Sequence, residues 1–366
     1  MRPTKAKINL ENLNTNFLNI RKKVKTSKVL AVVKANAYGH GVKEIVTSLN
    51  TLEKKPEYFG VAISDEGVEV SKLKVQQPIL IFEPLSLFNI EEIVKYKLIP
   101  TVFDESHIEL LEKTKKKVRV HVKIDTGMGR LGVNYSEAVS FIEKASKLEN
   151  IIVDGIYTHF ATSDAIDKEF ANKQLLRFKE IIKTLKEKKI NYGLAHCANS
   201  GAILDMPDSY LDMVRPGISL YGYYPSLETS ESIKLKPVMS IESKVASVKE
   251  FPEGESVSYS RLYFTDKKTK IISVPMGYAD GYNRNFTNKT ECIIKGKKYK
   301  QAGRVTMDRI MFDVGLDNIK VGDDVILLGS SGKLKIDAWD FSKIINTIPY
   351  EITCNISKRV PREYLK

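Results

Sequence analysis

The stretch VLAVVKANAYGHG, residues 29–41, decides how this sequence folds. Its first five residues are apolar and mostly β-branched, as is typical of a strand that is buried on both faces of a parallel sheet. A lysine ends the run, and alanines and glycines follow it. Such a strand needs similar strands beside it, and the sequence downstream supplies them.

Further apolar runs alternate with amphipathic stretches. The runs predict strands over residues 58–63, 79–82, 118–124 and 151–157. The amphipathic stretches predict helices over residues 64–73, 104–113 and 167–188. This alternation indicates a parallel sheet covered by helices. We therefore expect a closed (β/α)8 barrel over residues 9–225, with an open doubly wound sheet as the alternative.

The pattern changes after Pro225, where shorter β-branched and aromatic runs are broken by glycine, proline and aspartate. These runs predict strands over residues 238–248, 271–274, 292–294, 310–314 and 325–328. One helix is expected from a cap at Asp337 to Ile345, with Pro349 ending it. The sequence therefore predicts a mainly β second domain over residues 226–366, which the N-terminal strand 1–8 could join.

Length and composition agree with a folded two-domain protein. The chain has 366 residues, 42% hydrophobic and 28% charged, which excludes a single small module, a disordered tail and a collagen-like fibre. Its three cysteines are widely spaced, which argues against a disulfide scaffold and a structural zinc site. No apolar stretch approaches the roughly 18 residues of a membrane span. We expect a soluble cytoplasmic protein without a metal.

The formal net charge of +13 permits nucleic acid, an anionic surface or an anionic small molecule as partner. The lysines are mostly dispersed, as on solvated helix faces, and no nucleic-acid-binding signature is present. We therefore expect a small-molecule ligand, with no nucleic acid and no membrane as partner.

Candidate chemistry follows the predicted barrel strands, because catalytic groups in such barrels lie at the carboxyl ends of strands. Lys34 ends the first run, and the small residues around it leave room for a bulky ligand. Tyr38 lies four residues further on. On its position alone, Lys34 would be interpreted as a surface cap.

The segment DTGMGRLG follows another predicted strand. Lys123 and Asp125 share one face of that strand, and Arg130 emerges from the glycine-rich loop as a candidate carboxylate ligand. The glycines indicate backbone approach to a ligand. His159 lies just beyond the next strand, where a buried core histidine is the alternative reading, as an outward-pointing side chain is for Lys123.

Two later segments favour an anion site. Asn199 and Ser200 precede a predicted helix, where Ser200 fits the N-cap position and could bind an anion. Arg215 and Gly217 end the last predicted barrel strand, where phosphate sites of such barrels are common. The β domain adds further polar and aromatic candidates, namely Tyr259, Tyr278, Arg284, Met307, Asp308 and Tyr350.

Together these residues resemble the alanine racemase family, whose members are pyridoxal-phosphate enzymes of fold type III. Six motifs carry the resemblance in order and span nearly the whole chain. They lie at residues 32–41, 125–130 (DTGMGR), 196–200 (HCANS), 215–217 (RPG), 258–260 (SYS) and 277–281 (GYADG).

The resemblance implies pyridoxal 5'-phosphate as cofactor, bound covalently by Lys34. Arg215 would face the pyridine nitrogen of the cofactor, and Asn199 matches a cofactor-side position. Groups that would hold the phosphate are the hydroxyls of Tyr38, Ser200 and Tyr350 and the backbone amides of Gly217 and Ile218.

The family uses two bases, which implies a homodimer with shared active sites. Lys34 would be one base, and Tyr259 from the partner subunit's β domain the other, with His159 linking Tyr259 to Arg215. Arg130 and the Met307 backbone would fix the substrate carboxylate. Supporting positions match at Lys123, a candidate for carbamylation, and at the entryway residues Asp164, Tyr278 and Arg284.

The implied activity interconverts L-alanine and D-alanine, which supplies D-alanine for peptidoglycan. Thr306 stands where many relatives carry cysteine, so the alternative is a racemase of the same family that prefers serine or a basic amino acid. A decarboxylase of basic amino acids is disfavoured because it would place a carboxylate, and not Arg215, at the pyridine nitrogen. A basic nucleic-acid-binding protein or a cofactor carrier is the non-enzymatic alternative.

Overall fold

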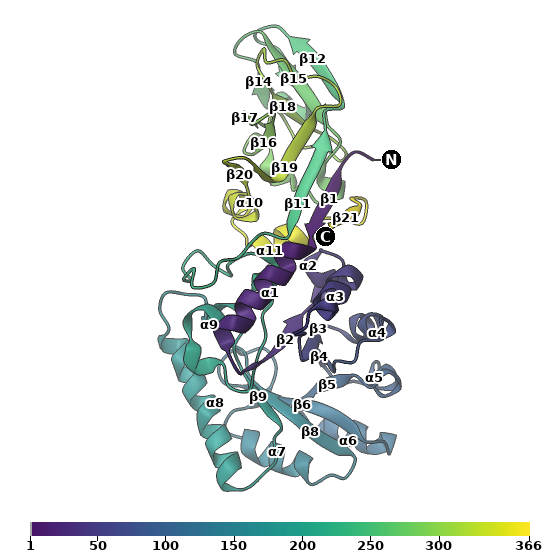
Figure 1. Cartoon of the computed structure of the whole chain (residues 1–366), viewed down its shortest axis with the longest axis vertical. Helices are drawn as coiled ribbons and strands as arrows, with labels where there is room; N and C mark the ends of the chain where they lie inside the picture. Colours follow the sequence, from purple (N-terminus) through teal and green to yellow (C-terminus); the bar gives the residue numbers. More distant parts are fainter. Residues whose placement is uncertain (1) are drawn as a thin grey trace. The chain divides into compact units, whose positions relative to one another are not determined.

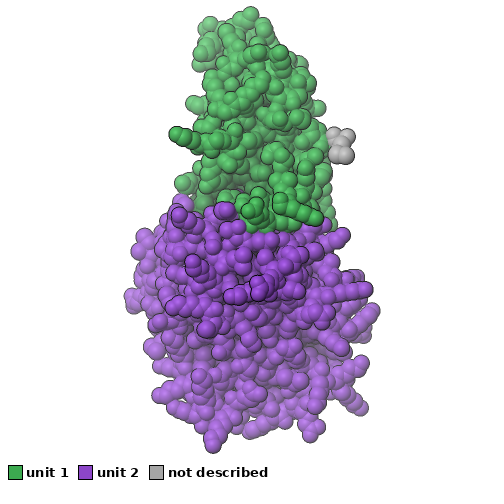
Figure 2. Space-filling view, in the orientation of Figure 1, with its two compact units in different colours: residues 1–12, 38–41, 237–366 green, residues 13–37, 42–236 purple. Residues whose placement is uncertain are grey.

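The computed structural model describes residues 2–366 and divides into two compact units. The barrel unit comprises residues 13–37 and 42–236, and the β unit comprises residues 2–12, 38–41 and 237–366 (Figure 2).

Eight parallel strands form the barrel (Figure 1). They are β2 (Lys28–Val32), β3 (Tyr58–Val61), β4 (Ile79–Pro84), β5 (Ile99–Val102), β6 (Val118–Asp125), β8 (Ile151–Tyr157), β9 (Leu194–His196) and β10 (Met213–Val214). The ring closes because β10 pairs with β2 and β5 pairs with β6. The two-residue strand β7 (Val133–Asn134) adds to β6 outside the ring order. The predicted closed barrel is confirmed, and the open-sheet alternative is wrong.

Helices surround these strands in Figure 1. The helices of the first 236 residues are α1 (Leu10–Val24), α2 (Lys34–Tyr38), α3 (Val42–Thr51), α4 (Ser64–Lys72), α5 (Ile90–Tyr96), α6 (Glu105–Thr114), α7 (Ala138–Ser146), α8 (Glu169–Glu187) and α9 (Ser200–Asp205), with 3-10 turns at Pro207–Ser209 and Ile218–Tyr221. In α8 the buried residues Leu175, Phe178, Ile182 and Leu185 recur every three or four positions. This spacing places one apolar stripe on the helix, which is why the periodicity predicted it.

Two sheets dominate the β unit, and their pairings are antiparallel except for the parallel pair of β1 and β21. The larger sheet has the order β17-β16-β19-β11-β1-β21 with β20 on β19, and the smaller has the order β12-β15-β18. The bounds are β1 (Lys5–Asn9), β11 (Met239–Lys244), β12 (Ser247–Phe251), β13 (Ser256–Val257), β14 (Tyr263–Phe264), β15 (Thr269–Val274), β16 (Glu291–Ile294), β17 (Lys297–Lys300), β18 (Ile310–Asp313), β19 (Asp324–Ser331), β20 (Leu334–Ile336) and β21 (Arg362–Leu365). The predicted mainly β second domain is confirmed.

Two predicted elements of this unit need correction. The single run expected over residues 238–248 is two strands, β11 and β12, which belong to different sheets. The helix α10 (Ala338–Ile345) starts as predicted at Asp337, whose carboxylate accepts from the Trp339 and Asp340 amides. Its end is set by Asn346 in the left-handed conformation, whereas Pro349 opens the next helix, α11 (Pro349–Cys354), because proline suits a first helical turn.

Among residues 2–366, no helix combines the length and the apolar character that a membrane crossing requires.

Candidate functional site

Lys34 directly follows β2 and Val33 and begins a left-handed turn. The next four residues, Ala35 to Tyr38, all have φ angles of 52° or 53°. This conformation costs L-residues about 1–2 kcal/mol each. Strain of this kind persists only where the surrounding structure imposes it, and it concentrates at functional sites.

Side chains and backbone of the barrel hold this turn. The Ala35 amide donates to Glu66 Oε1 over 2.5 Å, and the Asn36 side-chain oxygen accepts from the Val42 amide over 2.9 Å. Because Glu66 also caps the start of α4, the strained turn is tied to a neighbouring helix. Lys34 is therefore held at a defined position at the carboxyl end of the barrel strands.

Arg215 follows β10 and is 4% exposed. Its Nη1 donates to His196 Nδ1 over 2.8 Å, and its Nη2 donates to the Thr158 and Cys197 carbonyls over 2.8 and 3.1 Å. A fourth contact joins Nη2 to His159 Nδ1 at 3.3 Å. Within residues 2–366 these bonds use only the terminal nitrogens, so Nε remains available to an acceptor.

His159 is thereby placed beside Arg215. Burial, followed by the nearby positive charge of Arg215, lowers the pKa of His159 well below its ordinary value. The ring is neutral at physiological pH, and because Nδ1 accepts from Arg215, the proton sits on Nε2.

Lys123 lies inside the barrel on β6, 4% exposed, with its Nζ 5.6 Å from the centre of the Tyr157 ring. Burial and the positive charges of Arg130 and Arg215 lower the pKa of Lys123 to about 8. Lys34 acts in the same direction. About a tenth of Lys123 is therefore an uncharged amine at pH 7, far more than for an ordinary lysine, and the three cations Arg130, Arg215 and Lys34 all disfavour its charged form.

The glycine-rich loop after β6 owes its shape to internal contacts. The Asp125 carboxylate accepts from the Gly127 and Gly129 amides over 2.9 Å each. A Cβ on Gly132 would lie 2.6 Å from the Asp125 amide nitrogen, and one on Gly127 would lie 2.9 Å from the Phe170 ring. Packing therefore requires glycine at positions 127 and 132, and the expected approach of a ligand to this loop stays a prediction. Arg130 itself is exposed at the end of the loop.

A second cluster lies where α9 begins. Asn199, and not Ser200 as the sequence reading suggested, is the N-cap of α9: its side-chain oxygen accepts from the Ala202 amide over 3.1 Å. Ser200 Oγ instead accepts from the Gly217 amide over 3.0 Å and lies 3.0 Å from Ser219 Oγ. Ile218 opens the 3-10 turn that follows. The structure therefore brings Ser200 and the Gly217 backbone together.

The β unit carries the tyrosine candidates. The rings of Tyr38 and Tyr350 lie 5.9 Å apart between their centres. Tyr259 is 71% exposed and follows Ser258, whose φ of 70° turns the backbone sharply. Together with Thr306 and Asp308, Tyr259 lines an open groove of about 790 Å³.

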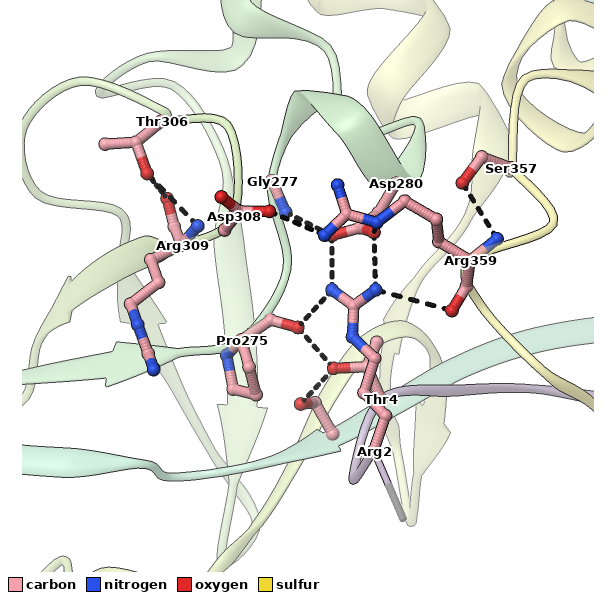
Figure 3. A network of polar contacts seen from close by, with 11 residues as sticks. Arg2, Thr4, Pro275, Gly277, Asp280, Thr306, Asp308, Arg309, Ser357 and Arg359 are labelled. Atoms are coloured by element: carbon pink, nitrogen blue, oxygen red, sulfur yellow. Dashed lines mark hydrogen bonds and ion pairs between the residues drawn. The ribbon is translucent and has the colours of Figure 1, made fainter.

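Polar contacts hold the residues on either side of Met307, and Figure 3 shows those of Thr306 and Asp308. The Met307 carbonyl accepts from the Ala279 amide over 3.1 Å, and Met307 itself is 52% exposed. Asp280, fully buried, accepts from both terminal nitrogens of Arg2 over 2.6 and 2.5 Å. Arg359 lies 3.4 Å from the same carboxylate and donates to Asp308 over 2.6 Å. Arg359 therefore links the GYADG motif to the segment that carries Met307, and Arg2 holds the Asp280 carboxylate from its other side.

Comparison with known proteins adds sequence and structure matches over the whole chain. Family models for the N-terminal and C-terminal domains of alanine racemase match residues 8–225 and 238–364. The chain belongs to the alanine racemase family.

Individual members of the alanine racemase family match at full length. The chain is 42% identical to alanine racemase 2 of Caldanaerobacter subterraneus over all of this chain and 95% of that one. It is 41% identical to the alanine racemase of Carboxydothermus hydrogenoformans over the whole of both. The solved alanine racemase of Clostridium difficile 630 is 39% identical, with a TM-score of 0.93 over 99% of this chain and 96% of that one.

The alanine racemase motifs fall in both units. Lys34, Lys123, His159 and Arg215 lie in the barrel unit with Asp164, whose carbonyl accepts from Ser226 Oγ. Residues that the structure assigns to the β unit are Tyr38, Tyr259, Tyr278, Arg284, Thr306, Met307, Asp308 and Tyr350. The Thr306 hydroxyl donates to the Arg309 carbonyl over 2.8 Å, so it closes the turn around Met307.

No role was predicted from the sequence for three further residues of this site, His121, Asp154 and His196, although His196 begins the HCANS motif. They continue the hydrogen bonds of Arg215 into the barrel. His121 lies two positions before Lys123 on β6, so the same period-two pattern that singled out Lys123 and Asp125 contained the signal for it.

Proposed function

We propose that this chain is a pyridoxal-phosphate-dependent alanine racemase, which interconverts L-alanine and D-alanine with Lys34 and Tyr259 as its two bases. The observation that carries the proposal is Arg215, a buried guanidinium held by uncharged acceptors with Nε available at the carboxyl end of the barrel. Membership of the alanine racemase family supports the same reaction.

The residues present fit the cofactor. Its phosphate needs several hydrogen-bond donors. In the barrel unit, Ser200 Oγ and the Ile218 amide can offer two, and the Gly217 amide, which donates to Ser200 Oγ, would turn to the phosphate when the cofactor binds. The Tyr38 and Tyr350 hydroxyls of the β unit are the further donors in this proposal. Its pyridine nitrogen needs a donor, which Arg215 Nε can be. When bound, pyridoxal phosphate stabilises the negative charge that develops on the substrate Cα as its proton leaves.

Arg215 biases the reaction toward racemisation. Burial lowers its pKa to about 10, which still leaves the guanidinium protonated at neutral pH. A group that keeps its own proton would only donate a hydrogen bond to the pyridine nitrogen, so that nitrogen would stay unprotonated and would attract electrons less strongly than a pyridinium held by a carboxylate. Negative charge would then stay near the substrate Cα, and the proton would return to that carbon.

Racemisation needs proton donors and acceptors on both faces of the substrate Cα. Lys34 serves one face, and Tyr259 of the partner subunit serves the other in a homodimer. The exposure of Tyr259 and the groove beside it, lined also by Asp308, support a role for this surface in assembly. His159, neutral and bonded to Arg215, can pass positive character to the tyrosine.

Arg130 and the Met307 backbone bind the substrate carboxylate in this proposal, and Asp164, Tyr278 and Arg284 line the approach to the site. Lys123 is the candidate for carbamylation. A buried lysine with a lowered pKa and with Arg130, Arg215 and Lys34 as like-charged neighbours supports this, because carbamylation replaces a cation by an anion that attracts Arg130.

In the cell, the proposed enzyme is cytoplasmic and supplies D-alanine for peptidoglycan. The Thr306 hydroxyl gives no reason to favour serine as substrate, since the turn with Arg309 already uses it.

The test is a racemisation assay of the purified protein with L-alanine, L-serine and L-lysine, together with an absorbance scan for bound cofactor. We expect a yellow protein with alanine as its best substrate. Lys34→Ala should lose both the absorbance of the attached cofactor and the turnover, whereas Tyr259→Phe should keep the absorbance and lose turnover. A colourless and inactive wild-type protein, or full activity in Lys34→Ala, would contradict the proposal.

A further inference from the structure

A chain of hydrogen bonds runs from Arg215 through the barrel interior to a carboxylate. His196 Nδ1 lies 2.8 Å from Arg215 Nη1, and His196 Nε2 lies 2.9 Å from His121 Nδ1. His121 Nε2 lies 3.3 Å from Asp154 Oδ2. Both histidines are fully buried, and the rings come from neighbouring parts of the barrel, because β8 pairs with both β6 and β9.

The two ends of the chain fix every proton in it. A guanidinium can only donate, so His196 Nδ1 accepts and its proton sits on Nε2. That proton is donated to His121 Nδ1, which places the His121 proton on Nε2. The His121 Nε2 proton then points at the Asp154 carboxylate, which can only accept when ionised.

The charges along the chain agree with this direction. Burial lowers the pKa of both His121 and His196, so the two rings are neutral. Burial of Asp154 is outweighed by hydrogen bonds from His121 and Arg119, which lower the pKa of Asp154 to about 2 and keep it ionised. The chain therefore joins a buried cation and an anion through two neutral dipoles that are aligned the same way.

The hydrogen-bond acceptors of Arg215 are uncharged. Its acceptors are two carbonyl oxygens and two imidazole nitrogens, and it forms no ion pair with a carboxylate within residues 2–366. A buried charge without a nearby partner is costly, and aligned dipoles that end on a carboxylate reduce that cost.

The barrel is built to hold the rings in place. A Cβ on Gly155 would lie 2.6 Å from the His121 ring, so only glycine leaves room for it. The His196 ring stacks on Tyr157 at 5.0 Å between centres with 5° between planes. Tyr58 and Arg119 fix Asp154 from the outer side, over 3.0 Å and 2.7 Å.

We propose that Asp154 is the remote counter-ion of Arg215 and that His121 and His196 transmit its effect in a single proton arrangement. The three are positioning residues: they orient the guanidinium and hold its charge where Nε meets its acceptor. The proton arrangement stands on the geometry of this chain alone, whereas its effect on the cofactor rests on the proposed function.

The first test is nuclear magnetic resonance of cofactor-free protein labelled with ¹⁵N in its five histidines. We expect His121 and His196 both to carry their proton on Nε2 and to have hydrogen-bonded Nε2 protons far downfield. In Asp154→Leu the His196 Nε2 proton, two groups away from the change, should move upfield. A proton on Nδ1 of either ring, or a charged ring at neutral pH, would overturn the proposal.

The matched control is Arg119→Gln, which removes the outer salt bridge of Asp154 and leaves the carboxylate and both rings. If Asp154→Leu does not fold, Asp154→Asn serves as a second variant, because it preserves the side-chain volume and keeps a hydrogen-bond acceptor. The Asp154 variants should move the His196 signal, and Arg119→Gln should move it far less. Equal effects of the Asp154 and Arg119 variants would reduce Asp154 to a stabilising surface residue and refute the inference.

The second test uses the cofactor-loaded enzyme with alanine. Loss of a residue that orients a ligand through another group typically costs about tenfold or more, so Asp154→Asn should lower kcat by about that factor. The absorbance maximum of the bound cofactor should shift, and the fraction of turnovers that end in transamination should rise. If the wild-type protein has no racemase activity, the proposed function is refuted, but the resonance test still applies. If the wild-type enzyme is active and Asp154→Asn leaves kcat, the absorbance maximum and the fraction of transamination unchanged, the counter-ion role is refuted.

Discussion

Loss of the Asp280 carboxylate should strongly destabilise the β unit. This side chain is fully buried and accepts hydrogen bonds from both terminal nitrogens of Arg2. The Nε atom of Arg359 lies 3.4 Å from Asp280 Oδ1. The carboxylate also accepts from the Gly277 amide over 3.0 Å. Removing one partner of a buried ion pair costs about 3–5 kcal/mol, because the other charge stays behind unpaired. Arg2 is 23% exposed, so water can partly solvate it, and we expect Asp280→Ala to cost about 3 kcal/mol.

The assay is urea unfolding followed by tryptophan fluorescence. Trp339 is the sole tryptophan of the chain and lies in α10 of the β unit, so its fluorescence reports on the unit that contains Asp280. With a denaturant slope of about 2 kcal/mol per molar urea, a loss of about 3 kcal/mol lowers the midpoint by about 1.5 M.

The matched control is Asp324→Ala, which breaks the exposed pair with Lys244 in the same unit, where the two side chains are 80% and 49% exposed. Exposed pairs contribute about 0–1 kcal/mol, so the midpoint should fall by less than about 0.5 M. If Asp280→Ala moves the midpoint no further than this control, the buried network does not stabilise the unit and the reasoning fails.

Two further predictions concern single residues. In bicarbonate-free buffer, the pKa of Lys123 is about 8 in the folded chain and 10.5 in the unfolded chain. Between these two values the unfolded chain binds more protons at this side chain than the folded chain does. The free energy of unfolding of the wild-type protein should therefore rise with pH from about 8 to 10.5. Lys123→Met should remove this rise and be more stable at pH 7 by up to about 3 kcal/mol, as thermal unfolding at pH 7 and 10 would measure; an unchanged pH slope would contradict it. Gly39→Ala should cost more than about 2 kcal/mol, because φ is +82° and the new Cβ would lie 2.2 Å from the Thr353 carbonyl oxygen. Gly296→Ala, with φ of +71° and open space around it, is its control, and equal losses in urea midpoint would show that contact with Thr353 is unimportant.

Much of the barrel could be predicted from local sequence because its longer strands are continuous apolar runs. Residues 29–33 and 151–157 were expected as strands, and β2 and β8 lie there within one residue. The strands β9 and β10 have three and two residues, which is too short for any periodicity. Their positions are set by pairing in the closed ring and not by local preference.

The candidate site divides in the same way. Residues such as Lys34 and Arg215 stand in motifs that neighbouring glycines and prolines mark in the sequence. Asp154 and His121 carry no such mark, because their importance comes from strand register: His121 lies opposite Gly155 on β8, and 75 positions separate it from His196. Only the closed barrel brings these groups into hydrogen-bonding distance.

Local preferences are violated where the proposed chemistry occurs. Four consecutive residues after Lys34 adopt a conformation that L-residues avoid, and Arg215 is a buried cation without an adjacent carboxylate. Each violation is compensated by groups from other barrel elements: Glu66 from α4 holds the turn, and Asp154 from β8 faces Arg215 through two histidines. Because sequence-local rules describe what a segment prefers by itself, they fail at positions that the assembled barrel holds against that preference. The failure of those rules at Lys34 and Arg215 is therefore itself a physical reason to place the reaction there.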